Sequence, residues 1–483
     1  MSSKTKQLQM HAIQSDLCSA THHKMPVEVF AALADQAWSI WLDSCCDVQT
    51  VLHPDSRYDV IVWQPTFTIT TRGDISEVLN HQLAPTEAKY CQHFADDPLT
   101  LLEQFQHQVF TDYTLQQTEL SRFIGALGYF GYDLGRRFER MPAIAENDIK
   151  LPDMAVGIYR HALVFDHVDQ RWQLICPEQN RAQLEQWLST ILANNITLKP
   201  AQKPFTLTTS WQANMSEQQY HQKFAEVQQY LLSGDCYQIN LAQRFKAAYQ
   251  GNEFNAYLAL RNANQAPFSA FIRIDDACIL SISPERFLQV QQGGTQSKPI
   301  KGTAPRAKNN IDDQQLAKEL QQSAKNRAEN VMIVDLLRND MSKVCQAGSV
   351  KVTELFAIES FPAVHHLVST IVGQLAVNKS AVDLLRGAFP GGSITGAPKI
   401  RAMQIIEQLE PHRRSVYCGS IGYIGANGDM DTNITIRTLV CHQQQIYAWA
   451  GGGLVADSIA ELEYQETYHK VDKILPILSG LSS

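Results

Sequence analysis

The spacing of apolar residues predicts strands along much of the chain. In the first part of the sequence, DVIVW at 59–63 and FTITT at 67–71 are strand-like, whereas LLEQFQHQV at 101–109 has the spacing of a helix. Further along, three runs either alternate apolar and polar residues or are rich in Ile, Val, Phe and Tyr: CYQINLAQRFKAAY, FSAFIRI and CILSISPERFLQV. Because turn residues separate these runs, we expect antiparallel sheets.

Helical patterns separate the sheet segments in the second part of the chain. Ser216 and Gln219 form a capping box, and apolar residues then recur at helical spacing until Gly234: Tyr220, Phe224, Val227 and Leu231. Three further helices are predicted: one over about 312–339, one from Pro398 to Leu409, and a C-terminal helix capped by Ser458 and Glu461. Strands are predicted at 419–426, 432–441 and 446–451. This grouping favours an α+β fold with large antiparallel β-sheets packed together and flanked by helices over a doubly wound parallel sheet.

One segment has the composition of a linker. ANNITLKPAQKPFTL, 193–207, contains Asn, Pro and Lys without apolar periodicity. We therefore predict an N-terminal α+β region over residues 1–195 and a second region over residues 205–483.

Composition narrows the class of protein. The chain has 483 residues, of which 44% are hydrophobic and 19% charged, as in ordinary globular proteins. No apolar run reaches the roughly 18 residues of a membrane span, and the start, MSSKTKQLQMHAIQSD, lacks the apolar core of a signal peptide. A formal net charge of -8 without a Lys/Arg block argues against nucleic acid as a partner. We expect a cytoplasmic protein that binds small molecules and other proteins, with no nucleic acid and no membrane partner.

The ten cysteines show no CxxC or CxxH spacing, and the nearest to a cluster is the adjacent pair Cys45 and Cys46. This distribution suggests neither a zinc site nor a disulfide framework. We expect reduced thiols, most of them buried.

A lysine in a tight turn is the first candidate for chemistry. In PIKGTAPR, 299–306, Lys301 lies between a proline and a glycine, where neither a helix nor a sheet surface needs a cation. Glu285, in SPERF, ends an apolar strand about one hairpin's length earlier, so an amine and a carboxyl are predicted to face one cavity. The alternatives are an exposed, solubilising lysine and a salt bridge between Glu285 and Arg286.

Three glutamates have the spacing of metal ligands. Glu329 lies on the apolar stripe of NRAENVMIVDLLRND, where a carboxylate needs a partner. We expect that neither Arg327 nor Lys325 can face it, whereas a metal ion could. Glu463 and Glu466 lie at i and i+3 on one face of the C-terminal helix, and carboxylate oxygens spaced in this way suit Mg²⁺. The alternative is a solvated helix face with an ion pair between Glu466 and Lys470.

Two glycine-rich segments and an arginine predict an anion site. In FPGGSITGAPKIRAM a glycine-rich loop precedes a helix in which Pro398 suits the first position, which leaves free N–H groups at the positive end. In WAGGGLVADS the glycines at 451–453 are expected in a flexible loop whose amides approach a carboxylate. Arg437 interrupts the apolar alternation of ITIRTLV with a bidentate carboxylate binder. Each glycine run alone is also typical of a turn, but together the segments describe a site for an acid with two carboxylates.

The motifs follow one another in a recognisable order over about residues 205–483: YQINLAQRF, SPERF, PIKGTAPR, AENVMIVDLLRND, GGSITGAPKIRAM, GSIGY, GGGLVADS and EYQETYHK. As a set they resemble the chorismate-utilising enzymes. Within this family the sequence is most similar to the aminodeoxychorismate synthase component I branch, because Lys301 stands where anthranilate and isochorismate synthases usually have alanine. Residues 1–195 resemble the N-terminal domain of anthranilate synthase component I only diffusely.

The resemblance implies roles for individual residues. Glu329 and Glu466, with Glu463 nearby, correspond to carboxylates that bind Mg²⁺, which holds the ring carboxylate of chorismate. Other residues match substrate contacts of the family: Thr303, Tyr417, Arg437, Gly451, Gly452, Gly453 and Lys470. His366 matches a histidine that the family retains near the pyruvyl side of the substrate, and the resemblance leaves its role open.

The resemblance also implies a mechanism that yields 4-amino-4-deoxychorismate for para-aminobenzoate and folate biosynthesis. Glu285 corresponds to the general acid that protonates the departing C4 hydroxyl. Lys301, deprotonated in cationic and partly buried surroundings that include Arg306, attacks C2 of the ring, and ammonia then opens the adduct at C4. Gln238 stands where the isochorismate and salicylate branch has a lysine that activates water, and glutamine is no base. Ammonia rather than water is therefore the expected nucleophile.

Partners are implied as well. The chain has no Gly-x-Cys-x-Gly motif, so a separate glutamine amidotransferase is expected to supply ammonia. Relatives form a tryptophan pocket at positions where this sequence has Ser44, Arg57, Pro267, Phe268 and Ser269. Two other functions stay open: anthranilate synthesis, against which Lys301 argues, and a catalytically silent chorismate- or tryptophan-binding subunit, in which the acids and the lysine would be lost.

Overall fold

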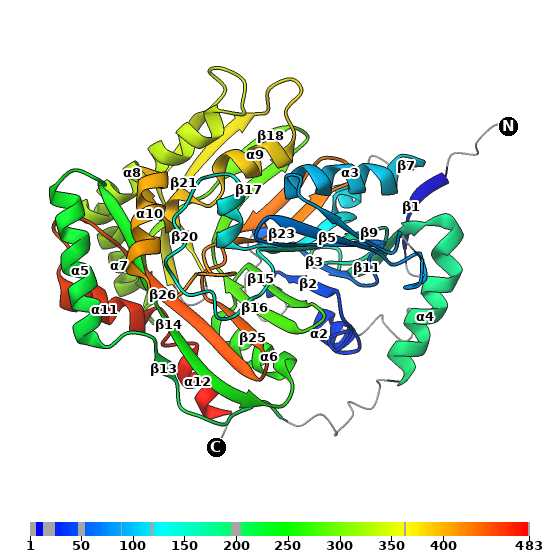
Figure 1. Cartoon of the computed structure of the whole chain (residues 1–483), viewed down its shortest axis with the longest axis horizontal. Helices are drawn as coiled ribbons and strands as arrows, with labels where there is room; N and C mark the ends of the chain where they lie inside the picture. The colour runs from blue at the N-terminus through cyan, green and yellow to red at the C-terminus, as the bar shows by residue number, and fades with distance from the viewer. Residues whose placement is uncertain are drawn as a thin grey trace.

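The computed structural model describes residues 6–12, 25–46, 54–87, 89–115, 119–194, 204–361 and 364–481. Two large sheets form the body of the molecule, and helices flank them (Figure 1). The predicted α+β fold is confirmed. Within the described ranges, no helix combines the length and the apolar character that crossing a membrane requires.

Sheet I has 14 strands in the described part of the chain. Its main path runs in the order β12 (Thr206–Leu207), β14 (Gln238–Gln250), β26 (Gln445–Leu454), β25 (Thr438–His442), β16 (Ala277–Ser283), β15 (Phe268–Arg273), β2 (Ser39–Asp43), β3 (Tyr58–Val62), β10 (Ala162–Asp166), β11 (Arg171–Pro177), β1 (Lys6–Ala12) and β7 (Tyr113–Leu115). The short strands β13 (Gln212–Ala213) and β22 (Gly396–Ala397) pair with β14.

Sheet II has 12 strands, counted over the same described ranges. Its order is β19 (Ile300–Pro305), β21 (Val364–Gln374), β18 (Gly294–Ser297), β17 (Arg286–Gln291), β24 (Met430–Asn433), β23 (Ser420–Gly425), β8 (Gly125–Phe130), β9 (Met154–Tyr159), β4 (Phe67–Arg72), β5 (Ile75–Asn80) and β6 (Cys91–Phe94), with β20 (Lys351–Ser360) on β21. The pairs that surround the site described below are antiparallel, as predicted.

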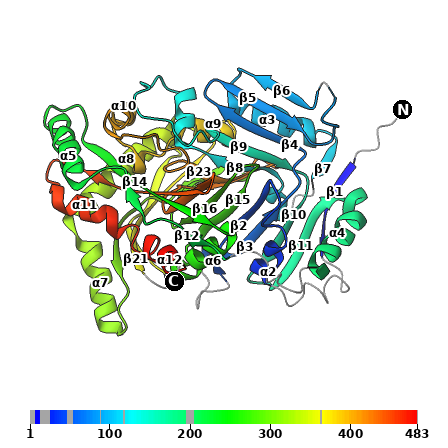
Figure 2. The same cartoon turned by 60° about the horizontal axis from the view of Figure 1, so that its bottom comes forward.

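The helices lie mainly around the ends and outer faces of the sheets (Figures 1 and 2). They are α2 (Pro26–Ala31), α3 (Pro98–Phe110), α4 (Arg181–Asn194), α5 (Glu217–Leu232), α6 (Glu253–Asn264), α7 (Asn310–Gln322), α8 (Ala324–Ser342), α9 (Ala381–Ala388), α10 (Lys399–Leu409), α11 (Ala460–His469) and α12 (Leu475–Gly480). Short 3-10 turns are η2 (Pro54–Ser56), η3 (Glu119–Phe123), η4 (Tyr132–Arg137), η5 (Glu178–Asn180) and η6 (Gly392–Ile394). Helices α5, α7 and α11 gather at one end of the molecule, and α4 lies at the other.

Alternation along the strands explains how the sheets pack. On β3, Val60 belongs to the core that contains side chains of both sheets, while its neighbour Ile61 belongs to a second core on the opposite face of sheet I. Helices α2, α6 and α12 contribute to that second core. The predicted helix α5 is confirmed, because Ser216 and Gln219 form the capping box and the four predicted apolar residues are buried.

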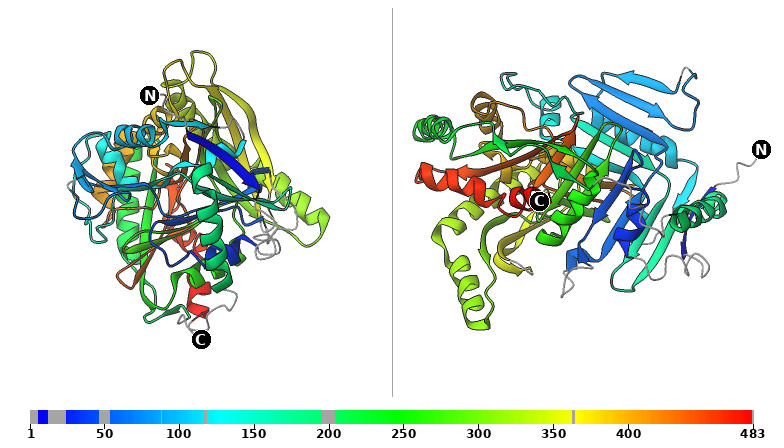
Figure 3. Two further views of the ribbon diagram at one scale, coloured as in Figure 1. Left: turned by 90° about the vertical axis from the view of Figure 1, so that its right-hand side faces the viewer. Right: turned by 90° about the horizontal axis from the view of Figure 1, so that it is seen from below.

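Both sheets take strands from both sides of the predicted linker. In sheet I, β2 and β3 precede it and β14 and β26 follow it; in sheet II, β8 and β9 precede it and β17 and β23 follow it. Figure 3 shows the blue N-terminal strands side by side with green strands of the later part of the chain. Residues 195–203 of the linker lie outside the described residues, and the division into 1–195 and 205–483 stays a prediction.

Two segments cross from one sheet to the other. The run CILSISPERFLQV is divided between β16 in sheet I and β17 in sheet II, and Glu285 lies at the crossing, just after the end of β16, where a strand end was predicted. The predicted continuous strand 432–441 is wrong, because β24 belongs to sheet II and β25 to sheet I. Arg437 lies at this second crossing with a φ of 50°. Hydrogen bonds join the crossings, from the N–H of Ile434 to the carbonyl of Glu285 and from the N–H of Ile282 to that of Arg437, both 3.0 Å long.

Three predicted helix boundaries are wrong. The expected helix over 312–339 is divided into α7 and α8 at Ser323, whose ψ of 112° is not helical and whose hydroxyl caps α8. Pro398 is the N-cap of α10 rather than its first residue. The N-cap of α11 is Ile459, while Ser458 donates its hydroxyl hydrogen to Glu463 at 2.8 Å.

Candidate active site

Glu285 is a buried acid at the first crossing, with 6% of its surface exposed. Burial raises the pKa of its carboxyl, while nearby Lys301 and a 3.1 Å hydrogen bond from the Ser393 hydroxyl work in the opposite direction. The alternative salt bridge with Arg286 is excluded, because that guanidinium is bound to Asp431 through two hydrogen bonds. Glu285 therefore does not form the salt bridge that was the alternative to a catalytic role.

Lys301 lies next to this acid. Its Nζ donates to the backbone carbonyl of Ser393 at 3.0 Å, so one serine contacts both predicted catalytic side chains. Burial lowers the pKa of the Lys301 amine, although the carboxylates of Glu285 and Glu329 favour its charged form. The acid is thus biased toward its protonated form and the amine toward its neutral form.

The surroundings of Lys301 differ from the prediction in two ways. The residue lies in strand β19 rather than in a tight turn, at a register irregularity between Ile300 and Thr303 where Gly302 has a φ of 90°. The cationic neighbour Arg306 is not directed at the lysine, because its guanidinium is bound to the Asp313 carboxylate. Desolvation, and not a cationic environment, is the main cause of the lowered pKa.

Glu329 on α8 and the pair Glu463 and Glu466 on α11 are brought together with two lysines. Lys325 lies 4.0 Å from a Glu329 oxygen and 3.8 Å from a Glu463 oxygen, so the expectation that it cannot face Glu329 is wrong. Lys470 pairs with Glu466 at 2.6 Å, which is the ion pair that the sequence offered as the alternative. Burial raises the pKa of Glu329 and Glu463, whereas for Glu466 the effect of burial is outweighed by Lys470, and its pKa is lowered.

These carboxylates have the chemistry of a magnesium site. Oxygen is the ligand that Mg²⁺ prefers, the side chains of Glu329 and Glu463 are largely shielded from solvent, and Lys325 lies within 4.0 Å of an oxygen of each. In the described residues the three side chains do not bring one oxygen each within 4.8 Å of the other two. The donor set fits Mg²⁺ with water or substrate oxygens completing its coordination.

The three glycines lie in strand β26, not in the expected flexible loop. They pair with residues 240–242 of β14, and β25 accompanies β26 only as far as Ala448. Along the described chain no strand covers the other edge of residues 451–453, and the side chains of Glu463, Glu466 and Gln238 lie beside Gly452 and Gly453. A Cβ on Gly452 would lie 3.1 Å from a Glu463 oxygen and 3.5 Å from a Glu466 oxygen, which explains why a side chain is absent there.

The predicted anion contacts lie around the second crossing. The side chain of Arg437 is half-buried; burial lowers its pKa, while the charges of Asp472 and Glu285 act in the opposite direction, and within the described residues the guanidinium makes no hydrogen bond or ion pair. Lys470 donates to the carbonyl of Gly451 at 2.8 Å. Tyr417 is buried and stacked on Trp449 with ring centroids 6.0 Å apart. A half-buried guanidinium without a hydrogen-bond partner loses part of its solvation, and a carboxylate ligand would compensate for that loss.

Thr303 and His366 form a pair across β19 and β21. The threonine Oγ1 lies 2.9 Å from Nδ1 of the histidine. Burial, with a contribution from Arg437, lowers the pKa of His366 to about 3, so its ring is neutral at ordinary pH. The histidine can therefore position Thr303 or accept a hydrogen bond, but it is not a cation.

A second cavity, of about 460 Å³, lies between the two sheets. It brings together all the residues predicted from the tryptophan pocket of relatives: Ser44, Arg57, Pro267, Phe268 and Ser269. The Ser44 hydroxyl donates to Asp59 at 2.6 Å, and Arg57 pairs with Asp166 at 2.9 Å. Arginine and carboxylate side chains both line the cavity, as a ligand with an ammonium and a carboxylate would require.

Sequence reasoning missed Ser393 and misplaced Lys325. Ser393 is within the motif GGSITGAPKIRAM, but only the backbone N–H groups of that motif were considered. Gln238 is buried, and its Oε1 has no hydrogen-bond partner in the described structure. Gln238 lies beside Gly453 in the structure, and in the sequence only its position in the motif YQINLAQRF indicated that it belongs to the site.

Comparison with known proteins decides among the chemistries that this site allows. Residues 41–476 match the family of chorismate binding enzymes. The chain belongs to that family. It is 51% identical over 446 residues to aminodeoxychorismate synthase component 1 of Escherichia coli (strain K12), with 92% of this chain and 94% of the relative covered. The same component of Klebsiella aerogenes is 50% identical over 449 residues, which cover 92% of this chain and 95% of the relative.

A solved structure supports the fold of this chorismate binding enzyme. The anthranilate synthase component I from Streptococcus pneumoniae TIGR4 matches with a TM-score of 0.76 and 31% identity, covering 88% of this chain and 94% of that one. The match therefore includes most of both sheets. Identity to the aminodeoxychorismate synthase components is markedly higher than to this protein.

Proposed function

We propose that the chain is the component of an aminodeoxychorismate synthase that converts chorismate and ammonia into 4-amino-4-deoxychorismate, for para-aminobenzoate and folate biosynthesis. The observation that carries this proposal is the pair of Glu285 and Lys301, bridged by Ser393, with pKa values moved in opposite directions. An anthranilate synthase needs no amine at position 301. The high identity to aminodeoxychorismate synthase components supports the same choice.

The proposed chemistry uses the two side chains in turn. The neutral amine of Lys301 attacks C2 of the ring, the ring double bonds shift, and the C4–O bond breaks. Glu285 gives its proton to the departing hydroxyl, which leaves as water. Ammonia then forms a bond at C4, the double bonds shift back, and the C2–N bond to Lys301 breaks. The two substitutions account for an amino group at C4 and a regenerated lysine.

Other residues bind and orient the substrate in this proposal. Arg437 pairs with one carboxylate of chorismate, and Lys470 and the backbone N–H groups of residues 451–453 approach the other. Thr303, held by His366, and Tyr417 confine the ring between them. Such positioning converts the attack by Lys301 into a reaction between fixed neighbours.

Glu329, Glu463 and Glu466 are the proposed magnesium ligands. When bound, Mg²⁺ would neutralise the carboxylates and attract the ring carboxylate of the substrate. Lys325 and Lys470, which now pair with these acids, would be displaced or shared. The lysines explain how three acids remain close together before the cation binds.

A glutamine amidotransferase is the proposed partner, because the chain carries no Gly-x-Cys-x-Gly motif of its own. The test is product identity by mass and ultraviolet spectrum after the purified chain is mixed with chorismate, Mg²⁺ and ammonium. We expect 4-amino-4-deoxychorismate with ammonium, and with glutamine only after an amidotransferase is added. Formation of anthranilate, or glutamine-dependent turnover by the single chain, would overturn the assignment.

The cavity between the sheets is the proposed tryptophan site. Its mixed charged lining and the aromatic side chain of Phe268 suit an amino acid with a large ring. Calorimetric titration with tryptophan should show saturable binding that Ser44→Ala and Arg57→Ala weaken. Equal binding by these variants and the unmodified chain would refute the site.

A further inference from the structure

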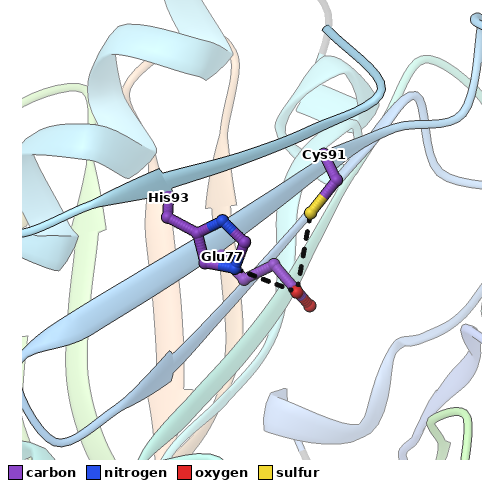
Figure 4. Close-up of side chains that lie close together, drawn as sticks. All are labelled: Glu77, Cys91 and His93. Carbon is purple, nitrogen blue, oxygen red and sulfur yellow. Dashed lines mark hydrogen bonds and ion pairs between the residues drawn. The ribbon is translucent and has the colours of Figure 1, made fainter. Parts of the chain in front are cut away.

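Three side chains of different chemistry converge at the outer edge of sheet II, where the terminal strand β6 pairs with β5. Glu77 on β5 lies directly opposite His93 on β6, and Cys91 is two residues before that histidine, on the same face. In Figure 4 the thiol and the imidazole both point at the carboxylate of Glu77. This edge lies far from α8 and α11, which carry the proposed magnesium ligands (Figure 2).

Two of the three distances between the ligand atoms are those of a tetrahedral metal site. The Sγ of Cys91 and the Nε2 of His93 lie 3.6 Å and 3.4 Å from the same Glu77 oxygen, and the three ligand atoms are all within 4.8 Å of one another. With zinc bonds of about 2.3 Å to sulfur, about 2.0–2.1 Å to nitrogen and about 2.0–2.2 Å to oxygen, tetrahedral angles give separations of about 3.6 Å and about 3.4 Å. We propose that Glu77, Cys91 and His93 bind Zn²⁺, with water as the fourth ligand.

The sequence rule that suggested no zinc site fails here for a geometric reason. CxxC and CxxH spacings belong to ligands on turns and helices, whereas ligands on one face of a strand are two residues apart, as in Cys91-Gln92-His93. The third ligand comes from the neighbouring strand, through a pairing register that no spacing rule reports. A thiol, an imidazole and a carboxylate are together a ligand set that zinc accepts.

Hydrogen bonding without a metal is the competing explanation for these contacts. Burial and Glu77 raise the pKa of the Cys91 thiol, so without a metal the sulfur is a weak nucleophile. Zinc would displace that proton and join the sheet's last strand to its neighbour. The cluster Glu217, His221 and Glu461 offers no sulfur, which makes it an internal control for weaker binding.

The test uses the full chain, stripped of metal with a chelator and kept in excess Mg²⁺ to occupy magnesium sites. Titration with Co²⁺ should saturate at one equivalent per chain and give the absorption spectrum of tetrahedral Co²⁺ with a thiolate-to-cobalt charge-transfer band. Added Zn²⁺ should displace the Co²⁺ and abolish that spectrum. Cys91→Ser should remove the band, and His93→Gln should weaken Zn²⁺ binding, measured against a chromophoric chelator, by roughly tenfold or more.

Two variants serve as matched controls. Cys46→Ser removes the other partly exposed cysteine of the described residues, and His221→Gln removes the imidazole of the second cluster; both should keep the band. All four variants should retain ammonium-dependent turnover, which confirms that they are folded. A charge-transfer band that persists in Cys91→Ser, or unmodified protein that shows no band at stoichiometric Co²⁺, would overturn the proposal.

Discussion

Gly452→Ala tests whether Glu463 and Glu466 act as metal ligands. The new Cβ would lie 3.1 Å from a Glu463 oxygen, inside the ordinary contact range that begins at 3.4 Å, so that oxygen must move by about 0.3 Å. Glu463 has little freedom to move, because the Ser458 hydroxyl donates to its other oxygen at 2.8 Å. Metal-ligand distances tolerate about 0.2 Å, so we expect the Mg²⁺ concentration for half-maximal turnover to rise about tenfold.

The assay is ammonium-dependent product formation across a Mg²⁺ titration at saturating chorismate. Gly480→Ala is the matched control, since a Cβ there meets no atom within 4 Å, and its Mg²⁺ dependence should be unchanged. If Gly452→Ala raised only the KM for chorismate and left the Mg²⁺ dependence unaltered, the glycine would serve the substrate, and the metal assignment of these two acids would be refuted.

Three further predictions concern the site. Ser393→Ala removes the hydrogen bond that lowers the pKa of Glu285 but keeps the backbone carbonyl that binds Lys301, so the pKa of Glu285 should rise. Turnover needs the protonated acid and falls as pH rises through that pKa, so it should persist to higher pH in this variant. An unchanged pH profile would contradict the role of the serine. Arg437→Met should weaken chorismate binding by roughly tenfold to a hundredfold, through loss of a charge-assisted contact of about 1.5–3 kcal/mol. The melting temperature should stay the same or rise, because a half-buried charge without a hydrogen-bond partner is gone. Tight binding by this variant would exclude the arginine from the anion site. Glu329→Gln and Glu466→Gln should each abolish turnover with the fold intact by circular dichroism, and full activity at limiting Mg²⁺ in both would end the magnesium proposal.

Local sequence patterns predicted helix α5 well, because its start depends on capping residues and its buried face on the spacing of apolar residues. Ser216 and Gln219 cap α5 as expected, and the apolar spacing of that helix matches its buried face. The run around Arg437 was predicted as a single strand because both of its halves are apolar, whereas Glu285 was predicted at the end of a strand. Only the packing of two sheets shows that these runs change sheet, and the change of sheet places both side chains in one site.

The candidate site was predictable in its residues but less so in its electrostatics. Lys301 was expected in cationic surroundings, whereas its nearest charged neighbours include Glu285 and Glu329, and burial lowers its pKa against them. Burial depends on the whole fold, so no local pattern reports it. Lys325 was misplaced for a related reason: it is four residues before Glu329, but its second partner, Glu463, comes from a distant helix.

The most direct test of the proposed mechanism is the mass of the intact chain after incubation with chorismate and Mg²⁺ without ammonia, followed by an acid quench. A covalent adduct of chorismate minus water, located by peptide mapping on the segment that contains Lys301, is the expected result. Lys301→Ala should show no adduct and should aminate chorismate at least tenfold more slowly, at about the level that removal of a catalytic nucleophile causes. An unmodified chain without an adduct, together with an unchanged rate of 4-amino product in Lys301→Ala, would contradict the mechanism and leave the lysine as a charge that lines the pocket.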